Sequence, residues 1–118
     1  MVLLRHDTAD GRSHYDWLID PGDGGRLISF RLDERLDAID GRVEADRMVD
    51  HRRLYLAYEG EISGGRGRVE QVARGTWTSC EVEPELVRVN GTLGTGSRTF
   101  RATRLGGSRW TIRVTALE

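Results

Sequence analysis

Most of this chain consists of short segments in which apolar and polar residues alternate, separated by glycine-rich turns. In "RWTIRVTAL" (109–117), for example, Trp110, Ile112 and Val114 fall on one side of an extended strand. Glycine supplies the positive φ angles that tight turns require, and it is concentrated in four turn segments. These are "DPGDGG" (20–25), "SGGRG" (63–67), "GTGS" (94–97) and "LGGS" (105–108). Many short strands at this spacing are typical of a sandwich or a small barrel.

The fold expected from this pattern is all-β: a small antiparallel β-barrel that forms a single domain over residues 1–118. Segment 33–50, "DERLDAIDGRVEADRMVD", does not follow the pattern, and we expect a short helix or a long loop there. The expected strands are 2–6, 14–20, 26–32, 54–59, 67–74, 76–82, 86–92, 98–105 and 109–116.

The charge composition limits the partners of the chain. A net charge of −1 argues against a broad electrostatic footprint on duplex nucleic acid. All 18 basic residues are arginine, however, and the planar guanidinium suits phosphate or carboxylate. A local arginine cluster at one end of a substrate therefore remains compatible with the composition.

Two features of the sequence bear on the cellular compartment of the protein. No run of about 18 apolar residues is present, so we expect no membrane-spanning helix. The single cysteine, Cys80, cannot form an internal disulfide. Both features fit a cytoplasmic protein.

Two of the three histidines of the chain lie in "RHDTADGRSHYD" (5–16). In an extended "SHYDWLID" (13–20), His14 and Asp16 share one face, and Tyr15 and Trp17 share the other. A turn over 8–13 would bring His6 across from His14 or Asp16, with Cβ atoms about 5 Å apart. Two histidines and one carboxylate suit a catalytic metal site with open positions. The same residues would also serve simply as hydrogen-bonding groups on a solvated strand.

The third histidine, His51, lies in "DHRRLY" (50–55) beside Arg52 and Arg53, with Tyr55 four residues further on. A histidine in this setting can protonate a leaving oxygen or hold a phosphate oxygen. An ordinary surface histidine in a basic loop is the alternative.

Taken together, "HD…HYD", "DHxxxY" and "EGEISGGRGRVEQVARGTW" (59–77) resemble the 3′-phosphoesterase domain of bacterial DNA ligase D. The similarity runs in order over roughly residues 3–116. It implies a compact β-barrel and metal-dependent removal of a 3′-terminal ribonucleoside and then of the 3′-phosphate. The substrate would be the 3′ end of DNA or RNA, and a separate ligase or polymerase is a possible partner.

The resemblance also implies roles for individual residues. His6, His14 and Asp16 would bind a divalent ion, most simply Mn²⁺, with Zn²⁺ or another transition metal as alternatives. His51 would contact the scissile phosphate, supported by Tyr55. The physics of such a site is sound, because an ion and a histidine on opposite sides of a phosphoryl group both neutralise its developing charge.

The chain departs from the family in two places that affect this site. Seven residues separate the N-terminal histidines where the family has five, so Asp7 or Asp10 is an alternative ligand to His6. Leu18 replaces a phosphate-binding arginine. Compensating arginines are to be sought among Arg52, Arg53, Arg42 and Arg5.

Two other functions fit the same residues. His14, Asp16 and His51 could form the iron site of a non-haem oxygenase, although that fold usually exceeds 118 residues. Alternatively, the domain is non-catalytic and binds a nucleic-acid end or a repair protein.

Overall fold

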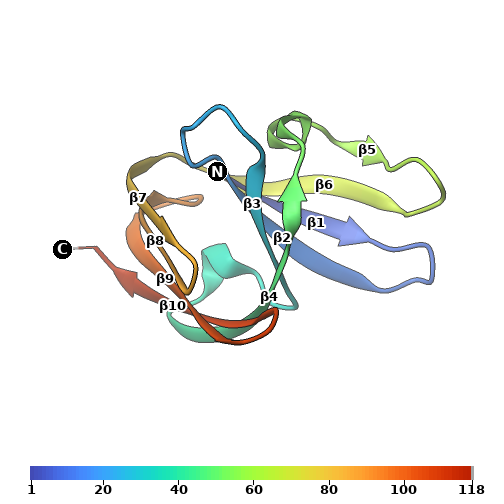
Figure 1. The fold of residues 1–118 in the computed structure, drawn as a ribbon. Coiled ribbons are helices and arrows are strands. Elements are labelled where there is room, and N and C mark those ends of the chain that lie inside the picture. The colour runs from blue at the N-terminus through green and yellow to red at the C-terminus, as the bar shows by residue number, and fades with distance from the viewer. Residues whose placement is uncertain (118) are drawn as a thin grey trace.

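The computed structural model describes residues 1–117 and is almost entirely antiparallel β-structure (Figure 1). Two short 3₁₀ helices interrupt the strands: η1 (Leu36–Ala38) and η2 (Arg53–Leu56). The strands are β1 (Val2–Asp7), β2 (Ser13–Ile19), β3 (Leu27–Leu32), β4 (Gly41–His51), β5 (Gly60–Glu61), β6 (Arg68–Arg74), β7 (Trp77–Glu83), β8 (Leu86–Thr92), β9 (Ser97–Gly106) and β10 (Arg109–Ala116). The all-β antiparallel prediction is confirmed.

The strands form one sheet in the order β5-β6-β1-β2-β3-β4-β10-β9-β8-β7. Within residues 1–117 the two edge strands, β5 and β7, do not pair with each other, so the predicted barrel is not closed. Instead the sheet curls, with β7–β10 forming one half, β1–β3, β5 and β6 the other, and β4 between them (Figure 1).

The curled sheet encloses a main core to which both halves contribute. Trp17 of β2 lies 5.7 Å from Phe30 of β3 and 5.2 Å from Phe100 of β9, measured between ring centroids. Trp110 of β10 lies 5.3 Å from Phe30. These aromatic contacts connect the two halves through the concave face of the sheet.

A second, smaller core lies on the other face of β1 and β2. Val2, Leu4 and Leu18 are buried there, covered by the segment 53–62. This segment, which we call the covering segment, contributes Tyr55, Leu56, Tyr58 and Ile62. Strands β1 and β2 are therefore buried on both faces, which explains the continuous apolar run at residues 1–4.

Two local predictions need correction. The short helix expected in segment 33–50 is present as η1, but residues 41–50 belong to the long strand β4, because Val43 and Ala45 alternate with polar residues and pair with β10, while residues 46–48 and 51 pair with β3. The predicted strand 54–59 is instead η2 and the chain after it, packed as a cover over the sheet. In both segments the tertiary position overrides weak local preference.

None of the helices in the described part of the chain is long and apolar enough to cross a bilayer.

Candidate metal centre

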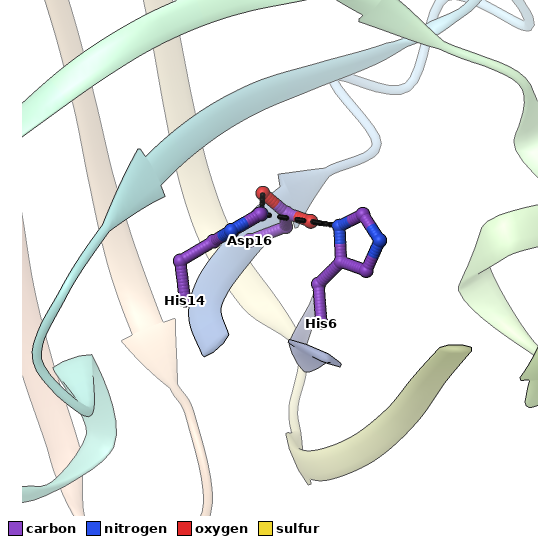
Figure 2. Close-up of side chains that lie close together, drawn as sticks. All are labelled: His6, His14 and Asp16. Carbon is purple, nitrogen blue, oxygen red and sulfur yellow. Dashed lines mark hydrogen bonds and ion pairs between the residues drawn. The ribbon is translucent and has the colours of Figure 1, made fainter. Parts of the chain in front are cut away.

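Three predicted ligands come together at the polar end of the outer face of β1 and β2. The β1–β2 register pairs His6 with His14 and Leu4 with Asp16, so all four side chains share this face. Figure 2 shows the side chains of His6, His14 and Asp16 pointing toward one another. In the turn between β1 and β2, Thr8 N–H donates to the Arg12 carbonyl.

The distances among the three side chains fit a shared cation. His6 Nδ1 lies 3.1 Å from His14 Nε2, His14 Nε2 lies 3.3 Å from Asp16 Oδ1, and His6 Nδ1 lies 3.8 Å from Asp16 Oδ2. Ligands about 2.1 Å from an ion in tetrahedral geometry lie roughly 3.4 Å apart. One ion can therefore contact all three with little movement, leaving the side toward the solvent for other ligands.

A backbone carbonyl orients one of these ligands. His6 Nε2 lies 2.7 Å from the carbonyl oxygen of Arg66, so Nε2–H donates to it and the lone pair is on Nδ1. Nδ1 is the atom that faces His14 and Asp16. A metal-binding histidine typically has this arrangement, in which a second hydrogen bond fixes the tautomer and the ring orientation.

The Asp16 carboxylate is buried, and the basic side chains around it lie farther away than in a short charge-assisted hydrogen bond. The residue is 5 % exposed, and its nearest basic side chains are the two histidines and Arg31, whose Nε lies 4.0 Å from Oδ1. The shortest of these contacts, 3.3 Å, exceeds the usual range for a charge-assisted hydrogen bond. A buried carboxylate facing a histidine lone pair is stabilised by a cation between them, so the donor set fits Mn²⁺, Zn²⁺ or Fe²⁺.

Two of the three ligands, His6 and Asp16, line a cavity of about 420 Å³. His51, Arg52 and Tyr55, from the end of β4 to η2, line it as well. The pairing of Leu27 with His51 holds the end of β4 against β3. Residues about 45 positions apart in the chain are thus brought to one site.

Hydrogen bonds and ring contacts position the side of the cavity formed by β4 and η2. His51 Nδ1 lies 2.9 Å from the Val49 carbonyl and donates to it, which leaves Nε2 available to a ligand. The Tyr55 ring lies edge-on to the His51 ring with centroids 5.9 Å apart, and the Arg52 guanidinium lies 6.0 Å from the Tyr55 centroid. These contacts make an aromatic and cationic wall opposite the metal ligands.

Two arginines that we did not single out as substrate-binding residues also line the cavity. Arg31 reaches the cavity because the β2–β3 register pairs it with Asp16. Arg66 lines the cavity while Nε donates to the Ser63 carbonyl at 2.8 Å. In "RLISFRL", Arg31 alternates with apolar residues, which indicates that it lies on the face away from the main core. Its pairing with Asp16 depends on the register between two strands and cannot be read from one strand alone.

Other predicted residues lie elsewhere. Arg53 is bound to Asp20 at 2.7 Å and to the Gly25 carbonyl, and Arg42 is exposed at the far end of β4. Leu18 is fully buried in the second core rather than in the cavity.

The remaining candidates, on β1 and in the turn that follows it, have local partners. Arg5 and Asp7 pair with each other at 3.0 Å. Asp10 accepts from the Thr8 hydroxyl and the Arg12 N–H, and both bonds lower the pKa of its carboxyl.

Comparison with models of known protein families and with curated protein sequences found no match. The third ligand of the cluster, beside His14 and Asp16, is His6, whereas an iron site of the oxygenase type required His51.

Proposed function

We propose that this cavity is the active site of a metal-dependent phosphoesterase that acts on phosphorylated 3′ ends of DNA or RNA. The observation that carries the proposal is a cluster of two histidines and a carboxylate, of which His6 and Asp16 line a cavity together with a histidine, a tyrosine and three arginines. The motif resemblance to the ligase D phosphoesterase domain supports the same chemistry. Together they favour a phosphate ester as the substrate.

Each residue has a distinct task in this proposal. His6, His14 and Asp16 hold the ion, which supplies a Lewis acid that neutralises phosphate charge. Arg31, Arg52 and Arg66 hold the remaining phosphate oxygens and orient the ester. His51, with Nε2 free, exchanges a proton with the ester oxygen, and Tyr55 holds the His51 ring in place.

The reaction is a hydrolysis. The oxygen of a water molecule bonds to phosphorus, and the bond from phosphorus to the 3′ oxygen breaks with its electron pair. The 3′ oxygen takes a proton from His51 Nε2, and His51 recovers a proton from solvent. The attacking water gives up a proton to solvent. The products are a 3′-hydroxyl end and inorganic phosphate.

The test combines metal binding with turnover. Wild-type protein is titrated with Mn²⁺ by calorimetry and then incubated with an oligonucleotide carrying a 3′-phosphate, and phosphate release is measured. His14→Ala is expected to lose both Mn²⁺ binding and turnover. His51→Ala is expected to keep Mn²⁺ binding and to lose about 100-fold or more in rate.

Ser13→Ala, on the same strand but outside the cluster, is the matched control and retains both properties. Metal binding without phosphate release for Mn²⁺, Zn²⁺ and Co²⁺ would refute catalysis and favour the non-catalytic alternative. Absence of metal binding would refute the site itself.

A further inference from the structure

Four arginines form a row across the outer face of β8, β9, β10 and the adjoining strand β4. None of them belongs to the strands that carry the metal centre. The register pairs Arg88 of β8 with Arg101 of β9, Arg101 with Arg113 of β10, and Arg113 with Arg42 of β4. We call these four residues the arginine row. Their side chains are on the outer face, because the residues that flank them in each strand point into the main core. These flanking residues are Val87, Val89, Phe100, Ala102, Ile112, Val114 and Val43.

The arginine row is not neutralised by the protein. Within residues 1–117, none of the four guanidinium groups lies within 4.0 Å of a carboxylate oxygen. The nearest acids in register are Glu81, opposite Arg88, and Glu44, two positions along β4 from Arg42. Glu44 is paired with Arg109 at 4.0 Å. Many other arginines of this protein, including Arg31, Arg35, Arg53 and Arg98, do have a carboxylate partner.

An unpaired row of this kind is unfavourable in the free protein. Like charges placed directly opposite each other in a sheet repel, and here three successive cross-strand pairs are arginine with arginine. An anionic ligand that bridges the row would remove this repulsion. The arrangement is therefore complementary to a linear polyanion.

The spacing of the row fits a phosphodiester strand. Neighbouring strands lie about 4.8 Å apart, so four strands span roughly 14 Å. Consecutive phosphates of a single strand can lie along this length, so one strand can contact more than one arginine of the row. Thr103 and Thr115 lie on the same outer face and offer hydroxyl donors beside the row.

We propose that the arginine row is a binding surface for the phosphate backbone of a single nucleic-acid strand. The neighbouring positions on this face are threonine, asparagine, leucine and glutamate, with no aromatic side chain on the described outer face of β8–β10. Binding is thus electrostatic and independent of base identity, because stacking platforms are missing. The inference stands apart from the metal chemistry, since it uses none of the cavity residues.

Binding of a fluorescent single strand of about 12 nucleotides is measured by anisotropy, in EDTA, over a range of salt concentrations. Each phosphate contact to a single strand contributes about 0.7 to the slope of log K against log salt. Arg101→Gln combined with Arg113→Gln is expected to reduce this slope by about 1.4 and to weaken binding at least about tenfold near 50 mM salt. Arg101→Lys combined with Arg113→Lys keeps the charges and is expected to retain most of the affinity.

The matched control is Arg26→Gln combined with Arg74→Gln, which removes two exposed arginines outside the row and the cavity. This control is expected to bind the strand as the wild type does. An equal loss in the control, an unchanged slope in the row variant, or equally tight binding of polyglutamate would overturn the proposal. Because metal is excluded, failure here leaves the phosphoesterase proposal untouched, and the reverse also holds.

Discussion

The outer faces of the two halves of the sheet differ in what covers them. On β1 and β2 the covering segment packs over Val2, Leu4 and Leu18, and a cavity forms at the edge of this second layer. Within residues 1–117, no second layer covers the outer face of β8, β9 and β10, which exposes arginine and threonine. The same sheet thus presents a partly enclosed site on one half and an open charged surface on the other.

Because of this difference, charge interactions have different strengths on the two faces. A covered face lowers the local dielectric, which strengthens charge interactions and favours a defined ion between His6, His14 and Asp16. An open face is screened by water and salt, so single contacts are weak and affinity needs several charges in a row. We therefore expect metal affinity to depend on the covering segment and strand affinity to depend on the number of arginines.

The largest effect is expected where the two halves share one core. Trp17 is fully buried and contacts rings from β3 and β9, so Trp17→Ala should cost about 3–5 kcal/mol and disrupt both sites together. Urea denaturation measures this change. A stable, folded variant that had lost only metal binding would show that the halves do not depend on a common core.

A core substitution beneath only one site should separate the halves. Leu18→Ala removes a fully buried side chain from the second core and should cost about 2–5 kcal/mol while weakening Mn²⁺ binding. Val89→Ala, buried in the main core beneath the arginine row, also lowers stability but should leave Mn²⁺ affinity unchanged. Equal losses of metal affinity in the two folded variants would contradict the role of the covering segment.

Within the covered half, the loop that orients His6 should control metal affinity. A Cβ at Gly67 would lie 2.0 Å from the Asp7 carbonyl oxygen, so Gly67→Ala displaces the loop whose Arg66 carbonyl binds His6. Loss of such an orienting bond typically weakens metal binding about 10–100-fold. Gly65→Ala is the control, because Gly65 also has a positive φ but has open space at Cβ. Calorimetry with Mn²⁺ should show the loss for Gly67→Ala alone.

On the open half, a substitution in the arginine row should stabilise the fold. Arg101 faces an arginine on each side, so Arg101→Thr should raise stability by about 0.2–1 kcal/mol while weakening strand binding. Thermal denaturation at low salt checks the sign. A destabilised variant would mean that these arginines contribute more by packing than they cost by repulsion.

The smallest effect concerns the ion pair between Arg53 and Asp20, outside both sites. The hydrogen bond from Arg53 holds the pKa of the Asp20 carboxyl below its ordinary value of 3.8, with a further contribution from the Gly22 N–H. Stability from this pair is therefore present above that ordinary value and lost as pH falls through the lower, folded-state pKa. Asp20→Asn should be slightly less stable than wild type at neutral pH and equal to it in strong acid, as denaturation at several pH values would show.

Several features of the fold followed from local pattern alone. The alternation in 98–105 and 109–116 identified β9 and β10, and the glycine-rich turns identified their ends. Strand β4 was not predicted because Val43 and Ala45 are the only two apolar residues that alternate with charged residues at its start. Their burial depends on pairing with β10, which is distant in sequence. The alternation within single strands also could not predict that the two edge strands, β5 and β7, do not pair.

The candidate site divides in the same way. Placing His14 and Asp16 on one face needed only the period of a strand, and the His6–His14 pairing needed only a hairpin. Arg31 and Arg66 join the cavity through strand register and through a loop conformation, neither of which one segment encodes. Arg53 was misplaced because its neighbour Asp20 is 33 positions away in the chain and captures its guanidinium.

By itself, the sequence determined that the chain is a sheet protein and that a histidine–aspartate pair projects from one strand face. These are properties of nearest neighbours along the chain, set by side-chain alternation and turn chemistry. Only the tertiary structure decided which strand faces are covered and which arginines stand in register. Both depend on pairing between distant segments, where a shift of one residue would turn every side chain to the other face.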